Sequence, residues 1–133
     1  MISLQNISIK LGQFTLENVS LKIPESKYGV LMGSSGSGKT TIVESICGLK
    51  KIKSGKIILD GIDVTDFRPG DRHLGYVPQE GVLFSTMTVK EQIAFGPIVR
   101  GWKKRTAFER AEELAHSLEI EHLLSRKPIG LSG

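Results

Sequence analysis

The sequence contains only one cysteine, Cys47, which excludes an intramolecular disulfide and a thiolate metal cluster within this chain. No apolar run approaches the length that a membrane-spanning helix needs. The N-terminus also lacks the basic segment followed by an apolar segment that marks a signal peptide. We therefore expect a cytoplasmic protein, in which any role at a membrane requires a separate membrane partner.

A strong excess of charge of one sign is also missing. The formal net charge is +4, and the densest basic cluster, residues 100–105, contains the single tryptophan, Trp102. Such a cluster fits either a basic patch with a stacking aromatic residue, as in nucleic-acid binders, or a solvated loop before a helix. The pattern favours the solvated loop. The length of 133 residues and the hydrophobic content of 39% are those of one modest soluble domain.

Glycine, in contrast, is abundant, and three glycines fall in one short segment. Residues 33–40 read Gly-Ser-Ser-Gly-Ser-Gly-Lys-Thr and fit the P-loop pattern G-x-x-x-x-G-K-[ST] at every fixed position. The glycines let successive backbone N–H groups turn inward around an anion. Lys39 adds a mobile charge for the outer phosphates, and Thr40 offers a hydroxyl to Mg²⁺. The candidate phosphate-binding residues are Gly33, Ser34, Ser35, Gly36, Ser37, Gly38, Lys39, Thr40 and Thr41.

The flanks of this segment support the motif. Residues 28–32 are mostly apolar and predict a short strand, while Ile42, Val43, Ile46 and Leu49 follow at helical spacing. The N-terminus of such a helix favours phosphate through its dipole. A solvated turn between two core elements is the alternative, but both flanks and all eight positions agree with the motif. We therefore predict that this segment binds the phosphates of a nucleotide.

The first part of the chain is predicted to be rich in strands. Residues 2–11 form a strand with a bulge near Gln5-Asn6, and residues 19–23 form an antiparallel strand. Asp60-Gly61 predicts a hairpin between two further strands. The polar segment 65–72 is expected to be a surface connection, and residues 74–77 a short buried strand.

The last third is predicted to be helical. Residues 88–91 fit a capping box before a helix that we expect to stop at Gly96-Pro97. Residues 106–109 fit a second capping box. The apolar stripe of this second helix is expected to consist of Phe108, Ala111, Ala115 and Leu118.

These features occur in a familiar order. An antiparallel N-terminal region, the P-loop, the segment Gly-Tyr-Val-Pro-Gln at 75–79 and a final Leu-Ser-Gly together resemble the nucleotide-binding subunit of an ATP-binding cassette (ABC) transporter. The resemblance implies an α/β fold: a P-loop NTPase core with an antiparallel β subdomain and an α-helical subdomain. It also implies an incomplete sheet, because the chain ends inside the signature motif. We expect the core to span residues 1–87 and the helical subdomain residues 88–133.

The resemblance assigns roles to the matching positions. Lys39 matches the lysine on the β- and γ-phosphates, and Thr40 matches a Mg²⁺ ligand. Gln79 matches the Q-loop glutamine, which reaches Mg²⁺ and the attacking water, although from the residues alone it reads as a surface loop residue. Ser132 and Gly133 match signature residues that contact the γ-phosphate held by the other subunit.

Two departures from the family pattern stand out. The family stacks an aromatic residue on adenine, but Leu11 occupies the matching position here; Phe14 lies close by and fits either this role or the core. The family's Walker B aspartate, catalytic glutamate and switch histidine are expected after Gly133. The three histidines of the chain do not occupy the switch position; they are His73, His116 and His122.

Residues 63–66, 83–89 and 94–96 resemble those of bacterial importers of sugars, polyamines and oxyanions. This resemblance implies an energy-coupling ATPase that binds Mg-ATP, pairs with a second copy of itself and drives separate transmembrane permease subunits. It would lie on the inner face of the membrane, with no nucleic acid as partner, and dock through residues 80–100. Two alternatives remain: a truncated nucleotide-binding module without hydrolysis, and a soluble ABC ATPase without a transport role.

Overall fold

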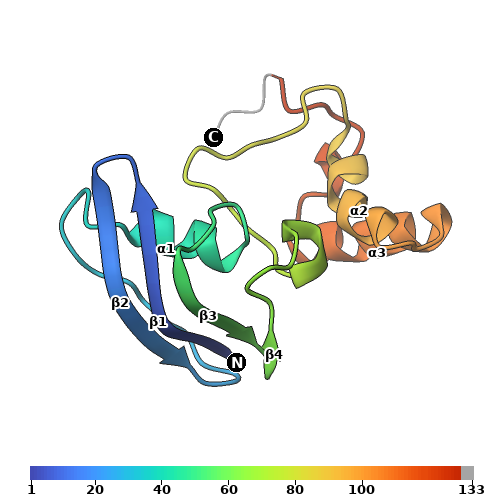
Figure 1. Cartoon of the computed structure of the whole chain (residues 1–133). Coiled ribbons are helices and arrows are strands. Elements are labelled where there is room, and N and C mark those ends of the chain that lie inside the picture. The colour runs from blue at the N-terminus through green and yellow to red at the C-terminus, as the bar shows by residue number, and fades with distance from the viewer. Residues whose placement is uncertain (130–133) are drawn as a thin grey trace. The chain divides into compact units, whose positions relative to one another are not determined.

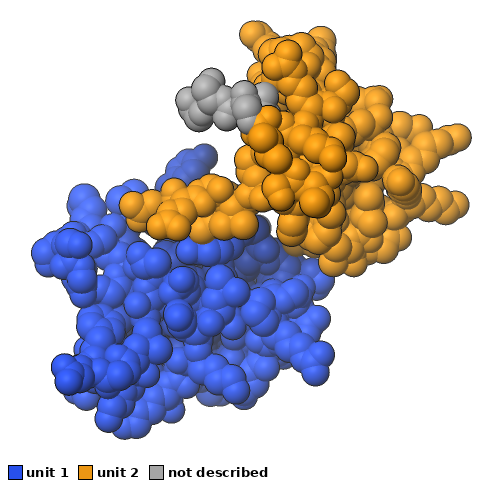
Figure 2. Space-filling view, turned by 90° about the horizontal axis from the view of Figure 1, so that it is seen from above, with its two compact units in different colours: residues 1–76 blue, residues 77–133 orange. Residues whose placement is uncertain are grey.

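The computed structural model describes residues 1–129 of the chain and separates into two compact units. Unit 1 comprises Met1–Tyr76 and unit 2 comprises Val77–Gly133 (Figure 2). The expected division between a core of residues 1–87 and a helical subdomain of residues 88–133 stays a prediction. Among the described residues, no helix combines the length and the apolar character that crossing a bilayer requires.

Unit 1 is built on a four-stranded antiparallel sheet of order β2-β1-β3-β4 (Figure 1). Its β1 and β2 pair from Ile2 opposite Ile23 to Leu11 opposite Phe14, with register shifts on both sides of Ile7. Asn6 lies there with a φ of 48°, so the predicted bulge is confirmed. The strands are β1 (Ile2–Leu11), β2 (Phe14–Ile23), β3 (Ser54–Leu59) and β4 (Ile62–Asp63).

The Asp60-Gly61 hairpin is confirmed between β3 and β4. Both central residues have positive φ, 47° at Asp60 and 85° at Gly61, as a two-residue turn with the twist of the flanking strands requires. Helix α1 (Lys39–Ile46) then packs its apolar side against the sheet. The core that results consists of Leu4, Ile7, Ile9, Ile42, Ile46, Ile57, Leu59 and Val64.

The strands predicted at 28–32 and 74–77 are not formed in the described residues. An apolar pattern predicts an extended backbone, but a strand also needs a neighbour that accepts and donates its hydrogen bonds. No described segment pairs with either stretch. Consequently Val30 is 77% exposed and Met32 88% exposed, and the sheet of the P-loop core is incomplete, as expected.

Unit 2 contains helices α2 (Val89–Val99) and α3 (Lys104–Ser117), followed by the 3₁₀ turn Glu121–Leu123. The first capping box is confirmed, because the Thr88 N–H donates to the Glu91 carboxylate at 2.8 Å and the Thr88 hydroxyl accepts from the Glu91 N–H at 3.3 Å. The two helices pack through Ala94, Ala107 and Ala111, with Ile93 and Phe108 around them.

Two predicted boundaries in unit 2 are wrong. Helix α2 does not stop at Gly96-Pro97 but continues to Val99 with Pro97 inside it, because a proline withholds a single donor and the next residues still close the helix. Helix α3 starts at Lys104, so the capping box at 106–109 is not formed. The earlier start places Ala107 in the core, and Leu118, expected on the apolar stripe, is 66% exposed.

Candidate functional site

The predicted phosphate loop leads directly into α1. Gly38 is the N-cap of that helix, with a φ of 91°, and its carbonyl accepts the first helical hydrogen bond from Ile42 at 2.9 Å. A Cβ atom at Gly38 would lie 2.7 Å from Phe14 Cζ and 2.8 Å from Leu16 Cδ1. Glycine is therefore required here twice, for its backbone angle and for the close approach of β2.

Lys39 folds back over the loop that precedes it. Its ammonium donates to the carbonyl oxygens of Gly33 at 2.9 Å and Ser34 at 2.7 Å, and it lies 3.4 Å from the hydroxyl of Ser37. The charge is thus held among oxygen atoms at the mouth of the loop. Phosphate oxygens are stronger acceptors than carbonyls, so an arriving phosphate competes directly for these donors.

The remaining donors of the loop suit an anion that also carries a metal. Gly33, Gly36 and Gly38 all have positive φ, the backbone conformation that lets successive N–H groups of such a loop face an anion before the helix N-terminus. Thr40 lies exposed on the first turn of α1, and Thr41 is half-buried behind it. A hydroxyl oxygen beside phosphate oxygens is the donor set that Mg²⁺ prefers, so these residues fit a Mg-nucleotide.

The two residues considered for the adenine contact lie opposite each other in the β1–β2 hairpin. Leu11 and Phe14 are paired across the hairpin, and Leu11 is 37% exposed. Phe14 is half-buried, and its ring lies against the backbone of Gly38. The structure therefore brings Phe14 to the phosphate loop, while the core cluster of unit 1 does not include it.

Arg72 is a residue of this region that the sequence did not reveal. It is only 7% exposed, and burial lowers the pKa of its guanidinium. Its Nη1 donates to the carbonyls of Ser45 at 2.8 Å and Ile46 at 3.0 Å at the end of α1. Its other donors reach the carbonyls of Thr65 at 2.9 Å and Phe67 at 3.2 Å.

This arginine ties the connection after β4 to the helix that carries the phosphate loop. A positive charge at the C-terminus of α1 complements the helix dipole, and the bonded carbonyls are those that a helix end leaves without partners. The neighbouring Gly48 leaves room for it, since a Cβ there would lie 2.8 Å from Arg72 Nε. An arginine in a polar segment gives no sequence signal for burial, so 65–72 was expected to be a surface connection.

Cys47, at the end of α1, is buried as expected of a small core residue. Burial raises the pKa of its thiol, with the nearby Arg72 acting in the opposite direction. A thiol of this kind is mostly protonated near neutral pH and reacts slowly.

Gln79 belongs to unit 2, where it lies exposed in a bend after Pro78. Its predicted role at Mg²⁺ and the attacking water stays a prediction. Ser132 and Gly133, the two signature residues, lie outside the described residues.

Comparisons with known proteins identify the family of the chain. The family model described as ABC transporter matches residues 16–133. The molybdate/tungstate import ATP-binding protein WtpC of Pyrococcus abyssi is 38% identical over 133 residues, covering 100% of this chain and 39% of that protein. The sulfate/thiosulfate import ATP-binding protein CysA of Synechocystis is 38% identical, covering 99% of this chain and 38% of that protein. The chain thus spans well under half the length of these relatives.

Solved structures show the same likeness. The dimeric ABC transporter cassette MJ0796 superposes with a TM-score of 0.83 at 29% identity, covering 100% of this chain and 64% of that one. A structure of the same cassette bound to ADP and Pi has a TM-score of 0.83 at 28% identity, covering 99% of this chain and 63% of that one. Together with the P-loop geometry around Lys39, these matches show that the chain belongs to the ABC transporter family of ATP-binding cassettes.

Proposed function

We propose that this chain provides the Mg-ATP-binding part of an ABC importer ATPase, a subunit that couples ATP hydrolysis to the transport of a solute. The observation that carries the proposal is the Lys39 ammonium held among the carbonyls of a glycine loop at the N-terminus of α1. The relatives named above are import ATP-binding proteins, which supports the importer role. The identity of the solute does not follow from these residues.

Each residue of the loop has a defined task in this proposal. Lys39 exchanges its carbonyl contacts for the β- and γ-phosphate oxygens, and the loop N–H groups hold the same phosphates. Thr40 would hold Mg²⁺, which supplies charge neutralisation during phosphoryl transfer when bound. Gln79 orients the attacking water, and Ser132 and Gly133 of a second copy would contact the γ-phosphate.

Phe14 is proposed as the contact for the adenine base, in preference to Leu11. Its ring already lies against Gly38, and an aromatic face stacks on a base more strongly than an aliphatic side chain does. Leu11, its hairpin partner, would border the same ring. The family pattern places this aromatic residue at the position of Leu11, so the assignment moves the contact from Leu11 to its hairpin partner Phe14.

The membrane partner is proposed to dock on residues 80–100. Leu83 is 61% exposed there, and Phe84 is 46% exposed while its ring also packs on Phe95 with centroids 4.8 Å apart. Gln92 holds this loop against α2, since its side chain accepts from the Phe84 N–H at 3.1 Å and donates to the Met87 carbonyl at 3.3 Å. A fixed loop with exposed apolar side chains suits a permease on the inner face of the cell membrane.

The alternative of a binding module without hydrolysis applies to residues 1–133 taken alone. Gln79 is not a base, and the family's catalytic glutamate and Walker B aspartate match no position up to Gly133. We therefore propose that this stretch binds nucleotide without sustained turnover, whereas the subunit with those carboxylates hydrolyses ATP. The importer-like segment at 83–96 argues against a soluble ABC ATPase without a transport role.

Two measurements test the proposal. Titration with a fluorescent ATP analogue and Mg²⁺ should show binding, and a phosphate-release assay on the 133-residue chain should show little turnover. Sustained turnover that Lys39→Ala abolishes would contradict the catalytic part, and absence of ATP binding would contradict the whole.

Docking is tested by crosslinking from an introduced cysteine. Because Cys47 is buried and its thiol pKa is raised, a bifunctional reagent at neutral pH reacts mainly with the new residue. Leu83→Cys in membranes should crosslink to an integral membrane protein, whereas Leu118→Cys, which is equally accessible at 66% exposure, should not. Equal crosslinking from both positions, or none from Leu83→Cys, would count against docking at this loop.

A further inference from the structure

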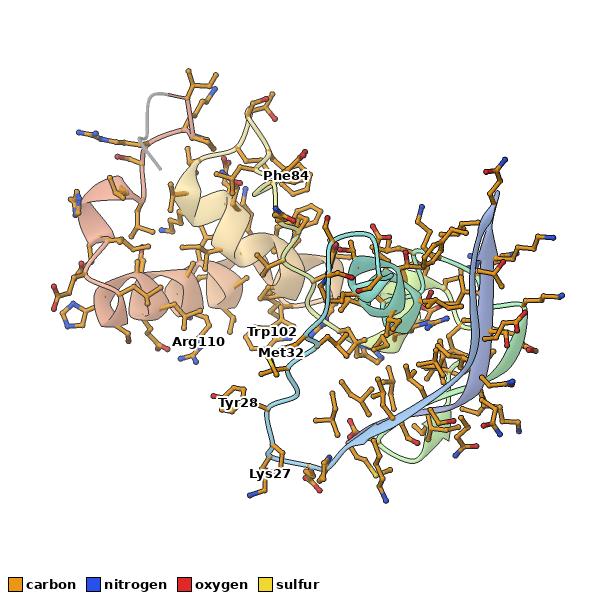
Figure 3. All side chains as sticks on the ribbon, turned by 90° about the vertical axis from the view of Figure 1, so that its left-hand side faces the viewer. Lys27, Tyr28, Met32, Phe84, Trp102 and Arg110 are labelled. Atoms are coloured by element: carbon orange, nitrogen blue, oxygen red, sulfur yellow. The ribbon has the colours of Figure 1, made fainter. Side chains whose placement is uncertain are left out.

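The turn between α2 and α3, taken here with the adjoining helix ends as residues 98–105, contains Trp102, which is labelled in Figure 3. The Trp102 N–H donates to the Pro97 carbonyl at 3.0 Å, and the Gly101 N–H donates to the Ile98 carbonyl at 2.9 Å. Gly101 has a φ of 87°. These are the two bonds and the left-handed residue of a Schellman motif, so the backbone of Trp102 is anchored at the end of α2.

The basic residues of this turn are placed against the preference of the helix that they begin. Helix α3 starts at Lys104, its N-cap Lys103 makes no side-chain cap, and no acidic residue occurs in its first turn. Cations at a helix N-terminus are unfavourable because the dipole is positive there. The early start of α3 brings Ala107 into the core, and it leaves Lys103 and Lys104 exposed at this unfavourable end of the helix.

The positive charge of the turn is also poorly compensated. No acidic residue occurs between Glu91 and Glu109 in the sequence. Arg105 pairs with Glu109 at 3.2 Å, and the Lys104 ammonium lies 5.3 Å from the centroid of the Phe108 ring. Among the described residues, no ion pair involves the turn's other two cations, Arg100 and Lys103.

Apolar side chains are exposed in the same turn. Val99 is 69% exposed and Trp102 49% exposed, and Ile98 is 36% exposed beside them. Phosphodiester backbones need the cations and a stacking ring, but they have no use for exposed aliphatic groups. A lipid surface uses both, since anionic headgroups attract lysine and arginine while tryptophan and aliphatic side chains enter the boundary below.

We propose that residues 98–105 form a contact site for the anionic lipid surface of the membrane. The complementary charge selects anionic headgroups, and Val99 and Trp102 supply the apolar part of the contact. The site rests on the proposed function in one respect, because a transport ATPase works next to a membrane. It adds a direct lipid contact to the attachment that the permease provides.

The emission of Trp102 tests the proposal without a label, since it is the only tryptophan of the chain. The probes are vesicles of phosphatidylglycerol, vesicles of phosphatidylcholine and a mixed-sequence single-stranded DNA oligonucleotide. Phosphatidylglycerol should shift the emission to the blue, less so at high salt, and phosphatidylcholine should not. No shift with phosphatidylglycerol, or a response to the oligonucleotide alone, overturns the lipid assignment.

Two pairs of lysine substitutions test whether the basic residues of this turn are the ones that bind the vesicles. Lys103→Gln/Lys104→Gln should weaken vesicle binding by about thirtyfold, from the contribution of each basic residue near an anionic surface. This variant removes charges that oppose the α3 dipole, so loss of folding does not explain a loss of binding. Lys51→Gln/Lys53→Gln removes two exposed lysines from unit 1 and should leave binding unchanged. If both pairs weakened vesicle binding equally, binding would depend only on the net charge of the chain, and the assignment of the site to residues 98–105 would be overturned.

A third variant tests the apolar part. Val99→Ser keeps every charge and should weaken vesicle binding by about fivefold. An unchanged affinity would overturn insertion below the headgroups. ATP binding is measured on the same samples. If the unaltered chain binds ATP but not vesicles, only the lipid site is contradicted. If the unaltered chain does not bind ATP, the proposed function is contradicted.

Discussion

The Lys39 ammonium lies 2.7 Å from the carbonyl oxygen of Ser34, inside the loop that it is expected to share with phosphate. The lysine therefore stabilises the free loop as well as the bound one. Binding exchanges these carbonyl contacts for contacts to charged phosphate oxygens, and only the difference between the two sets contributes to affinity.

Lys39→Ala should weaken ATP binding by about 1.5–3 kcal/mol, the range for one charge-assisted contact. Because the free protein also loses its internal contacts, we expect a value near the lower end. Titration with a fluorescent ATP analogue measures it. Lys53→Ala, which removes an exposed lysine elsewhere in unit 1, is the control. Equal affinities for Lys39→Ala and the unaltered chain would remove Lys39 from the site.

Gly38→Ala should damage the phosphate loop more than Gly36→Ala does. Both glycines have positive φ, 91° and 79°, so both substitutions carry a backbone cost of about 1–2 kcal/mol. Only Gly38→Ala also places a Cβ 2.7 Å from Phe14 Cζ, because nothing lies within 4 Å of a Cβ at Gly36. Thermal unfolding and ATP titration of both variants check this.

The contact with Phe14 can be isolated by a double substitution. The loss of stability in the double variant Phe14→Ala/Gly38→Ala should be smaller than the sum of the two single losses, since Phe14→Ala removes one of the two side chains, Phe14 and Leu16, that the new methyl group meets. If the losses of stability of the two single variants were strictly additive in the double variant, the Phe14 ring would move aside from the new methyl group without cost.

Arg72→Met should lower the free energy of unfolding by about 3 kcal/mol, because buried carbonyl acceptors at the end of α1 lose a charged donor. Urea unfolding followed by far-UV circular dichroism measures the change. Arg68→Met, at an exposed position four residues earlier, should cost almost nothing. A similar cost for the two would mean that Arg72 is not a structural tie.

The sequence predicted several features that depend on local chemistry. The glycine loop at 33–38, the Asp60-Gly61 turn and the Thr88 capping box each depend on residues a few positions apart, and each is present. Arg72 could not be predicted, because its acceptors at Ser45 and Ile46 are distant in sequence. The strand expected at 28–32 failed for the same reason, since pairing depends on a neighbour that a local pattern does not specify.

The start of α3 shows a competition between two rules. Thr106 and Glu109 fit a capping box, and a helix beginning there would be well capped. The structure begins the helix at Lys104 without a side-chain cap, which brings Ala107 into the α2–α3 core at 0% exposure. Burial of the small residue between two helices outweighs a surface hydrogen bond. Tertiary packing of this kind is not visible in a short sequence window.

The capping box of α2 should make the stability of unit 2 depend on pH in the acid range. Hydrogen bonds from the Thr88 backbone N–H and hydroxyl lower the pKa of Glu91 below the ordinary glutamate value. Because the folded pKa is the lower one, the ionised carboxylate stabilises the folded state above the ordinary pKa. This contribution is lost as the pH falls through the folded pKa.

Glu91→Ala measures this contribution directly. Urea unfolding followed by Trp102 emission reports on unit 2, which contains the only tryptophan. The difference in unfolding free energy between the unaltered chain and Glu91→Ala should be largest near neutral pH and should shrink as the pH falls below about 4. Thr88→Ala removes the hydroxyl donor but keeps the backbone N–H, the larger cause of the lowered pKa of Glu91, so it should reduce the pH dependence only in part. A difference that stays constant from neutral to acid pH would mean that Glu91 acts only through its helix propensity.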